Sequence, residues 1–249
     1  MIKIAENRRE LNIKWNVRDV SLSIIILILF LAAIYFGASR LFAAITGREV
    51  LRITAMDDLS FSVLYGIQVF LMLGVVWFFA IFWRKSSLKD LGLNYYSIWK
   101  TIWYSFLSLI VIFVLSFLYV FLMNTLFGIE APPSQVDQLI MEGDISSSIL
   151  LVVIVLVAPV AEEIFFRGYL YSAFKKAWGV GAGLFLSSLL FALAHMELYS
   201  FVPIFVIGWI LAYIFEKTKS LFPIIFLHAA YNLILILILL GRIDMIRMY

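Results

Sequence analysis

Long apolar runs separated by short polar segments dominate the chain. We read seven of these runs as membrane helices, because an open strand edge would leave backbone groups unpaired in lipid. They lie at residues 20–38, 60–82, 99–126, 147–166, 181–196, 201–216 and 221–240. The fourth is expected to continue through Lys176 before Trp178 and Gly179 end it. The pattern predicts an all-α, polytopic membrane bundle of about seven transmembrane helices, within a range of six to eight.

The composition is that of a membrane protein. Hydrophobic residues make up 64% of the chain and charged residues 14%, with a mean hydropathy of +1.05. Soluble domains contain about 45–50% apolar and about 25% charged residues. The chain has no cysteine, which excludes a disulfide framework, a thiol nucleophile and a cysteine-ligated metal site.

Basic residues predict the orientation of the helices. With the N-terminus in the cytoplasm, 14 of the 19 lysines and arginines fall on inside segments. The 128–146 segment contains acidic residues and no basic one, so it is expected outside. A cysteine introduced at Ser134 tests this, because a label that reaches it only from the cytoplasm would contradict the orientation.

The chain is expected to divide into four parts. These are a cytoplasmic amphipathic lead-in (1–19), a three-helix half (20–127), an extracytoplasmic loop (128–146) and a catalytic four-helix half (147–249). The lead-in offers apolar side chains to the membrane surface, namely Ile4, Leu11, Trp15 and Val17. A solvated basic tail is the alternative interpretation of this segment.

Three ionisable residues interrupt the fourth apolar run, in the sequence APVAEEIFFRG at 158–168. Glu163 and Arg167 are four residues apart, so on a helix they can form an ion pair. Glu162 points about 100° away from Glu163 and has no such local partner. The alternative is that all three lie at the headgroup level and anchor the end of the helix.

The only two histidines also fall within or at the ends of apolar runs. His195 ends the fifth run, and His228 lies in the seventh, one helical turn before Asn232. A lone membrane histidine more often makes an interhelical hydrogen bond than it catalyses a reaction. However, each charged group near a helix centre costs about 2.5–3.5 kcal/mol, so we expect these polar groups to converge on one hydrated pocket.

The residue types in this predicted pocket suit hydrolysis. Glu162 can act as general base on a water, while His195 and His228 orient the water or donate a proton. Asn232 can stabilise an oxyanion. The alternative is a zinc site formed by Glu162, His195 and His228, although the chain has no His-Glu-x-x-His motif.

Three ordered motifs carry a resemblance to a known family. Glu-Glu-x-x-x-Arg at 162–167, Phe-x-x-x-His at 191–195 and His-x-x-x-Asn at 228–232 follow one another along the chain. Together with LKDLGL at 88–93 and the stretch 208–232, they resemble the CPBP (Abi) family of membrane proteases, relatives of the type II CAAX prenyl endopeptidases. The resemblance covers residues 84–240.

The resemblance implies a membrane-embedded CAAX-type endopeptidase of a bacterial or archaeal cell membrane, with its active site toward the cytoplasm. By the family pattern, Glu162 activates water, Glu163 braces Arg167, and both histidines surround the water. Asn232 serves the oxyanion. No cofactor is expected, and a zinc metalloprotease is the alternative. The expected partners are membrane lipids and a membrane-associated peptide or protein terminus, without nucleic acid.

Two other classes of function compete with the protease. One is a non-enzymatic immunity or regulatory protein that binds a membrane peptide, since some relatives are assigned to bacteriocin self-immunity. The other is a proton-coupled transporter that uses Glu and His as a relay. The transporter is disfavoured because the sequence shows no second polar layer and no pair of interrupted helices.

Overall fold

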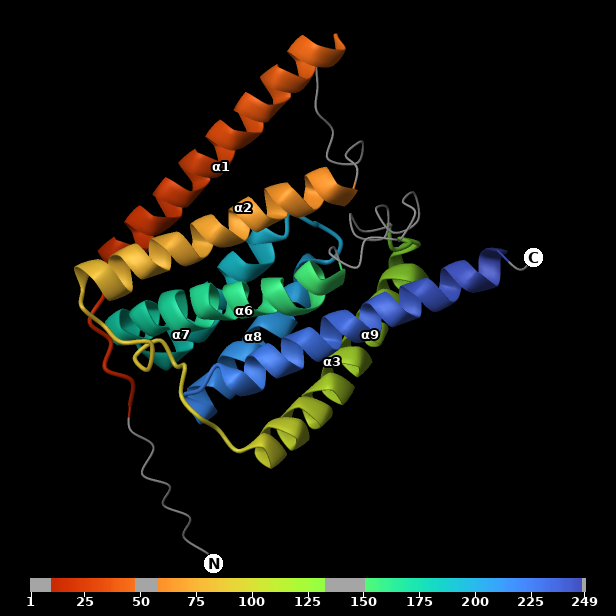
Figure 1. The fold of residues 1–249 in the computed structure, drawn as a ribbon. Coiled ribbons are helices and arrows are strands. Elements are labelled where there is room, and N and C mark those ends of the chain that lie inside the picture. The colour runs from red at the N-terminus through yellow and green to blue at the C-terminus, as the bar shows by residue number, and fades with distance from the viewer. Residues whose placement is uncertain (1–9, 48–57, 133–150, 248–249) are drawn as a thin grey trace, which may run out of the picture.

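The computed structural model describes residues 10–47, 58–132 and 151–247, and within these ranges the chain is helical without strands. Figure 1 shows the helices. The π-helical segment η2 follows α2, and η3 and η4 lie on either side of α6. The elements are α1 (Val17–Thr46), α2 (Asp58–Val76), η2 (Trp77–Trp83), α3 (Ile98–Phe127), η3 (Val153–Val157), α6 (Ala158–Glu162), η4 (Glu163–Tyr171), α7 (Ser172–Ala194), α8 (Phe201–Thr218) and α9 (Phe222–Arg247).

Six helical stretches among the described residues are long and apolar enough to cross a membrane. They are Val17–Arg40, Val63–Trp83, Ile98–Phe127, Val153–Ala194, Phe201–Thr218 and Phe222–Gly241. The predicted all-α membrane bundle is therefore confirmed. The count differs from seven because the fourth and fifth predicted segments fall in the single stretch Val153–Ala194, which has 42 residues.

The stretch Val153–Ala194 turns back on itself at Gly179. A straight helix of that length would extend about 63 Å, twice the thickness of a bilayer core. Gly179 instead has φ 87° and ψ 173°, a conformation outside the helical region that glycine adopts readily. Phe166 precedes this glycine in the chain and Phe191 follows it. Because the chain turns back, the centres of their rings lie only 5.2 Å apart. The predicted helix end at Gly179 is thus present as a break.

The bundle places this hairpin at its centre. In Figure 1, α1 and α2 lie on one side of it and α3 and α9 on the other, with α8 packed against α7. The α7–α8 contact is close because a Cβ on Gly208 would lie 3.2 Å from Ser188 Cα and from Phe191 Cδ1. The outer surface is rich in apolar side chains, including the exposed Trp77, Trp83, Trp99 and Trp103, which suits contact with lipid.

The expected position of the lead-in at the membrane surface is wrong for Trp15. Residues 10–16 contain no helix, and α1 begins at Val17 after an N-cap at Asn16. Trp15 is fully buried, and its Nε1–H donates to the Tyr169 carbonyl at 2.9 Å. A tryptophan enters a core readily when its only donor finds an acceptor there. Ile4 and Ser134 lie outside the described residues.

Replacing Trp15 tests this anchor. Trp15→Ala is expected to lower the free energy of unfolding by about 3–5 kcal/mol, because it opens a cavity in the core. Trp99→Ala is the matched control, since Trp99 is 78% exposed. The measurement is thermal unfolding of each variant purified in detergent. Equal melting temperatures for the two variants would contradict the role of Trp15 in the core.

Candidate active site

Glu163 is the centre of the polar cluster inside the bundle. It is the first residue of η4, and its side chain is fully buried. Its Oε1 accepts a hydrogen bond from Arg167 Nη1 at 3.0 Å, which is the ion pair predicted from the i, i+4 spacing. The same oxygen lies 2.8 Å from Nδ1 of His228 on α9. One carboxylate thus joins two helices.

Arg167 extends this cluster to α7 and α8. Its side chain is also fully buried, and Nη2 donates to the Gly208 carbonyl at 3.2 Å. The guanidinium carbon lies 4.2 Å from the centre of the Phe191 ring, within the range of a cation–π contact. Burying an ion pair is costly unless further hydrogen bonds satisfy its atoms. Here Gly208 supplies one of them, and its missing side chain lets the α8 backbone approach.

His228 faces both glutamates. Its Nδ1 contacts the Glu163 carboxylate, so Nδ1 carries the proton and donates. In the neutral ring Nε2 is then the acceptor. That nitrogen lies 3.8 Å from Glu162 Oε2. The arrangement of a carboxylate that orients a histidine toward a second reactive group is common in enzyme active sites.

Glu162 has a hydrogen-bond partner that the sequence does not reveal. Tyr65 on α2 donates its hydroxyl proton to Glu162 Oε1 at 2.9 Å. The two residues are 97 positions apart, and Tyr65 is one of 12 tyrosines, so no local pattern distinguishes it. Glu162 Oε1 is thereby held in place, while Oε2 points toward His228.

His195 joins the cluster through an aromatic ring. It follows the last residue of α7, and its Nδ1 lies 2.8 Å from the Phe191 carbonyl, which makes Nδ1 the donor. The Phe191 ring contacts the His195 ring at 4.7 Å and the His228 ring at 5.8 Å. Phe191 therefore contacts both imidazole rings, and the Phe-x-x-x-His motif supplies this phenylalanine together with the second histidine.

Asn232 binds the backbone of the neighbouring π-helical segment. Its Nδ2 donates to the carbonyl of Ile154 in η3 at 3.0 Å. In the i to i+5 register of a π-helix, that carbonyl would pair with residue 159, which is a proline without an N–H. Asn232 supplies the missing donor. Because an amide nitrogen has two hydrogens, one N–H remains for another acceptor.

The six predicted site residues are therefore brought together to different degrees. Glu162, Glu163, Arg167 and His228 lie in one contact network, His195 reaches it through Phe191, and Asn232 packs beside it. Over the part of the chain that the structure describes, no three His, Asp or Glu side chains are grouped so that they could hold a metal ion. The zinc alternative of Glu162, His195 and His228 does not fit this geometry, so no step below is written through a metal.

Comparison with known families agrees with these motifs. Residues 144–234 match the family described as type II CAAX prenyl endopeptidase Rce1-like. This part of the chain is similar to that family. The Rce1-like region contains all six predicted site residues, whereas Tyr65 lies outside it. The resemblance to membrane proteases of the CPBP family is thereby confirmed.

One curated relative also matches part of the chain. The UPF0177 protein YbdI of Lactococcus lactis subsp. lactis (strain IL1403) is 33% identical over 87 residues. The matched segment is 34% of this chain and 46% of that protein, so the chain spans about half the length of this relative. No solved structure matches the chain.

The buried ion pair generates a test of its own. Arg167→Ala is expected to lower the yield of folded protein sharply, because breaking a buried pair by removing one partner costs about 3–5 kcal/mol. The double variant Arg167→Ala with Glu163→Gln also removes the stranded charge, and it should recover part of the yield. Size-exclusion chromatography of detergent-extracted protein measures both.

An Arg167→Ala protein that folds as well as the wild type would contradict this structural role. It would point instead to Arg167 as a direct ligand for a substrate, such as a peptide carboxylate.

Proposed function

We propose that this chain is an integral-membrane endopeptidase in which Glu162 activates water for hydrolysis of a peptide bond. The Rce1-like match supports a membrane CAAX-type endopeptidase in general. The observation that carries the finer proposal is the unequal environment of the two glutamates. Glu163 is fully buried and its Oε1 contacts both Arg167 and His228, whereas Glu162 is 14% exposed and keeps Oε2 directed at the histidine. We therefore assign the role of general base to Glu162, the more accessible of the two carboxylates.

The gap between Glu162 and His228 is suited to a water molecule. Oε2 and Nε2 lie 3.8 Å apart, which is too long for a direct hydrogen bond and short enough for one water to contact both. In the proposed step, Glu162 removes a proton from this water as its oxygen attacks the scissile carbonyl carbon. The carbonyl oxygen becomes an oxyanion, which the second N–H of Asn232 stabilises.

The second half of the reaction breaks the peptide bond. The tetrahedral intermediate collapses, its carbonyl re-forms, and the carbon–nitrogen bond breaks. Glu162 returns its proton to the leaving amine nitrogen. His195, whose Nδ1 is bound to Phe191, presents Nε2 as a further proton acceptor. Protons balance in this route without any redox partner.

The proposed substrate is a membrane-associated peptide or protein terminus, reached from the cytoplasmic side of a bacterial or archaeal cell membrane. The basic segments assigned to the cytoplasm support this orientation, because several of them meet at one end of the bundle. Lys14 donates to the Lys85 carbonyl at 2.6 Å, and Lys175 pairs with Glu10 at 2.8 Å. Lysines gathered at one set of helix ends are typical of the cytoplasmic face.

The Glu162→Gln variant tests the general base. It keeps the size of the side chain and an acceptor for Tyr65, so the protein should fold normally. We expect kcat to fall by about 10²–10⁴-fold in a peptidase assay with the purified full chain. Tyr65→Phe, which removes only the hydrogen bond that holds Glu162, should lower kcat by about tenfold. Glu130→Gln, an exposed isosteric change, is the matched control.

A peptidase that keeps wild-type kcat in Glu162→Gln would refute Glu162 as the base. If a cellular phenotype that depends on this protein also survives the change, a non-enzymatic binding function would be favoured. The same assay with a chelator tests the zinc alternative. Loss of activity on chelation and recovery with added zinc would overturn the metal-free mechanism and leave the peptidase assignment standing.

A further inference from the structure

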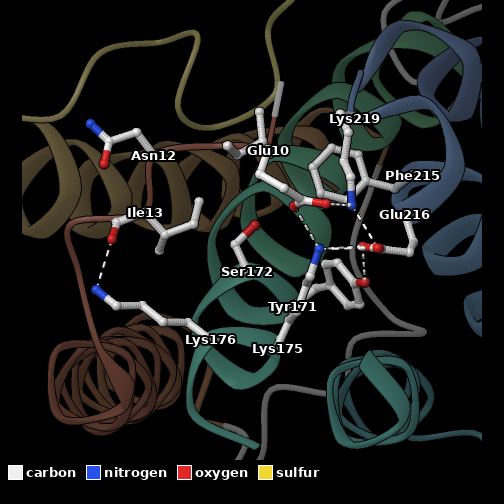
Figure 2. Close-up of a pocket in the computed structure, with 11 residues that line it drawn as sticks. Glu10, Asn12, Ile13, Tyr171, Ser172, Lys175, Lys176, Phe215, Glu216 and Lys219 are labelled. Carbon is white, nitrogen blue, oxygen red and sulfur yellow. Dashed lines mark hydrogen bonds and ion pairs between the residues drawn. The ribbon is translucent and has the colours of Figure 1, made fainter. Parts of the chain in front are cut away.

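A cavity lined by charged side chains lies at the end of the bundle, apart from the glutamate cluster. It has a volume of about 350 Å³, and none of the six predicted site residues lines it. Its walls come from the lead-in at 10–13, from η4 and α7 just before Gly179, and from the last turn of α8 (Figure 2). The proposed peptidase makes no use of this cavity.

Two lysines and two glutamates meet in this cavity. Lys175 Nζ lies 2.8 Å from Glu10 Oε2 and 2.9 Å from Glu216 Oε2. Lys219 Nζ lies 2.6 Å from Glu216 Oε1 and 3.3 Å from Glu10 Oε1. Figure 2 shows both ammonium groups directed toward the same pair of carboxylates. The geometry is that of an anion held between two cations, with a carboxylate now in the anion position.

The two carboxylates are held very differently. Glu216 belongs to α8, is 17% exposed, and also accepts a hydrogen bond from the Tyr171 hydroxyl at 2.5 Å. Glu10 is 69% exposed and belongs to the non-helical lead-in. Glu216 is therefore part of the wall. Glu10 is an anion that can be displaced.

The lysines retain capacity for a better anion. Lys219 Nζ is buried and makes no hydrogen bond of good geometry, in spite of the two nearby carboxylates. Burial is the main cause that lowers the pKa of Lys219, so an added negative charge would stabilise its ammonium form. Without Glu10, the lining has three lysines, the third being Lys176, against the single carboxylate of Glu216. A group with more oxygens and more charge than a carboxylate would satisfy this site better.

The cavity also lies where membrane helices begin and end. The lead-in precedes the span that starts at Val17, Lys175 precedes the break at Gly179, and Lys219 follows the span that ends at Thr218. Groups at such positions are level with lipid headgroups. Clustered lysines on the cytoplasmic side of a membrane attract anionic lipids.

We propose that this cavity binds the phosphate of a phosphate ester, the headgroup of an anionic lipid, in the position that the Glu10 carboxylate occupies. Glu10 then acts as an acidic latch, which closes the site when it is empty and leaves when a phosphate enters. Lys175 and Lys219 are the ligands of the phosphate, and the lead-in is the part of the chain that moves. This inference does not depend on the peptidase activity.

Lipid retention by the purified full chain tests the proposal. The protein is exchanged into nanodiscs of phosphatidylcholine with a minor fraction of phosphatidylglycerol, and retained phosphatidylglycerol is counted by native mass spectrometry. Glu10→Gln should raise the apparent affinity by about fivefold, the factor for one unit of charge near an anionic surface. Lys219→Gln and Lys175→Gln should lower it by at least the same factor. Lys217→Gln is the matched control, since Lys217 is exposed on the same turn and lies outside the cavity.

Two further arms separate the sources of the phosphate. Glycerol 1-phosphate added at millimolar concentration should displace the lipid only weakly, and complete displacement would assign the site to a free phosphate ester in place of a membrane lipid. Melting temperatures of the same variants distinguish a Glu10 that a phosphate can displace from a Glu10 that is a permanent ion-pair partner. Unchanged retention in Glu10→Gln together with a lower melting temperature would overturn the site, because Glu10 would then be a permanent ion-pair partner.

Discussion

The ion pair between Glu163 and Arg167 is the contact on which the rest of the site depends. Both side chains are fully buried, and burying an ion pair is costly unless further contacts satisfy its atoms. His228 from α9 and the Gly208 carbonyl from α8 supply two such contacts, while Glu163 Oε2 and Arg167 Nε make no hydrogen bond. The requirement to satisfy one buried pair therefore fixes three helices relative to one another.

The hairpin at Gly179 follows from the same constraint. Arg167 has its guanidinium over the Phe191 ring, which must come from a helix that runs back beside η4. The left-handed conformation of Gly179 permits that reversal. The π-helical register of η4, which carries both Glu163 and Arg167, is a feature often found at functional sites. The irregular backbone of η4 thus coincides with the buried polar groups.

The two polar regions share one helical stretch and differ in purpose. Arg167 faces the interior of the bundle, and Tyr171, one turn later, hydrogen-bonds Glu216 at the wall of the outer cavity. In the interior, Glu163 is paired with Arg167, a fixed partner on the same helical segment. At the helix ends, Lys219 faces a carboxylate from a non-helical segment. We interpret the first as a preorganised catalytic site and the second as an adjustable contact with the membrane surface.

The sequence by itself determined the features that depend on composition and near neighbours. Apolar runs required a helical membrane bundle, and spacings of four residues put Glu163 beside Arg167 and His228 on the same side as Asn232. Gly179 was recognisable as a helix end because glycine is common where helices stop. The roles of the site residues stay predictions, because hydrolysis depends on a substrate as well as on side chains.

Only the tertiary structure decided which distant residues meet. It paired Tyr65 with Glu162 across 97 positions, buried Trp15 against Tyr169, and gave Asn232 the Ile154 carbonyl that Pro159 leaves without a donor. It also folded two predicted spans into the single stretch Val153–Ala194. Such contacts leave no periodic signal in the chain, because they depend on how whole helices pack and not on the spacing within one helix.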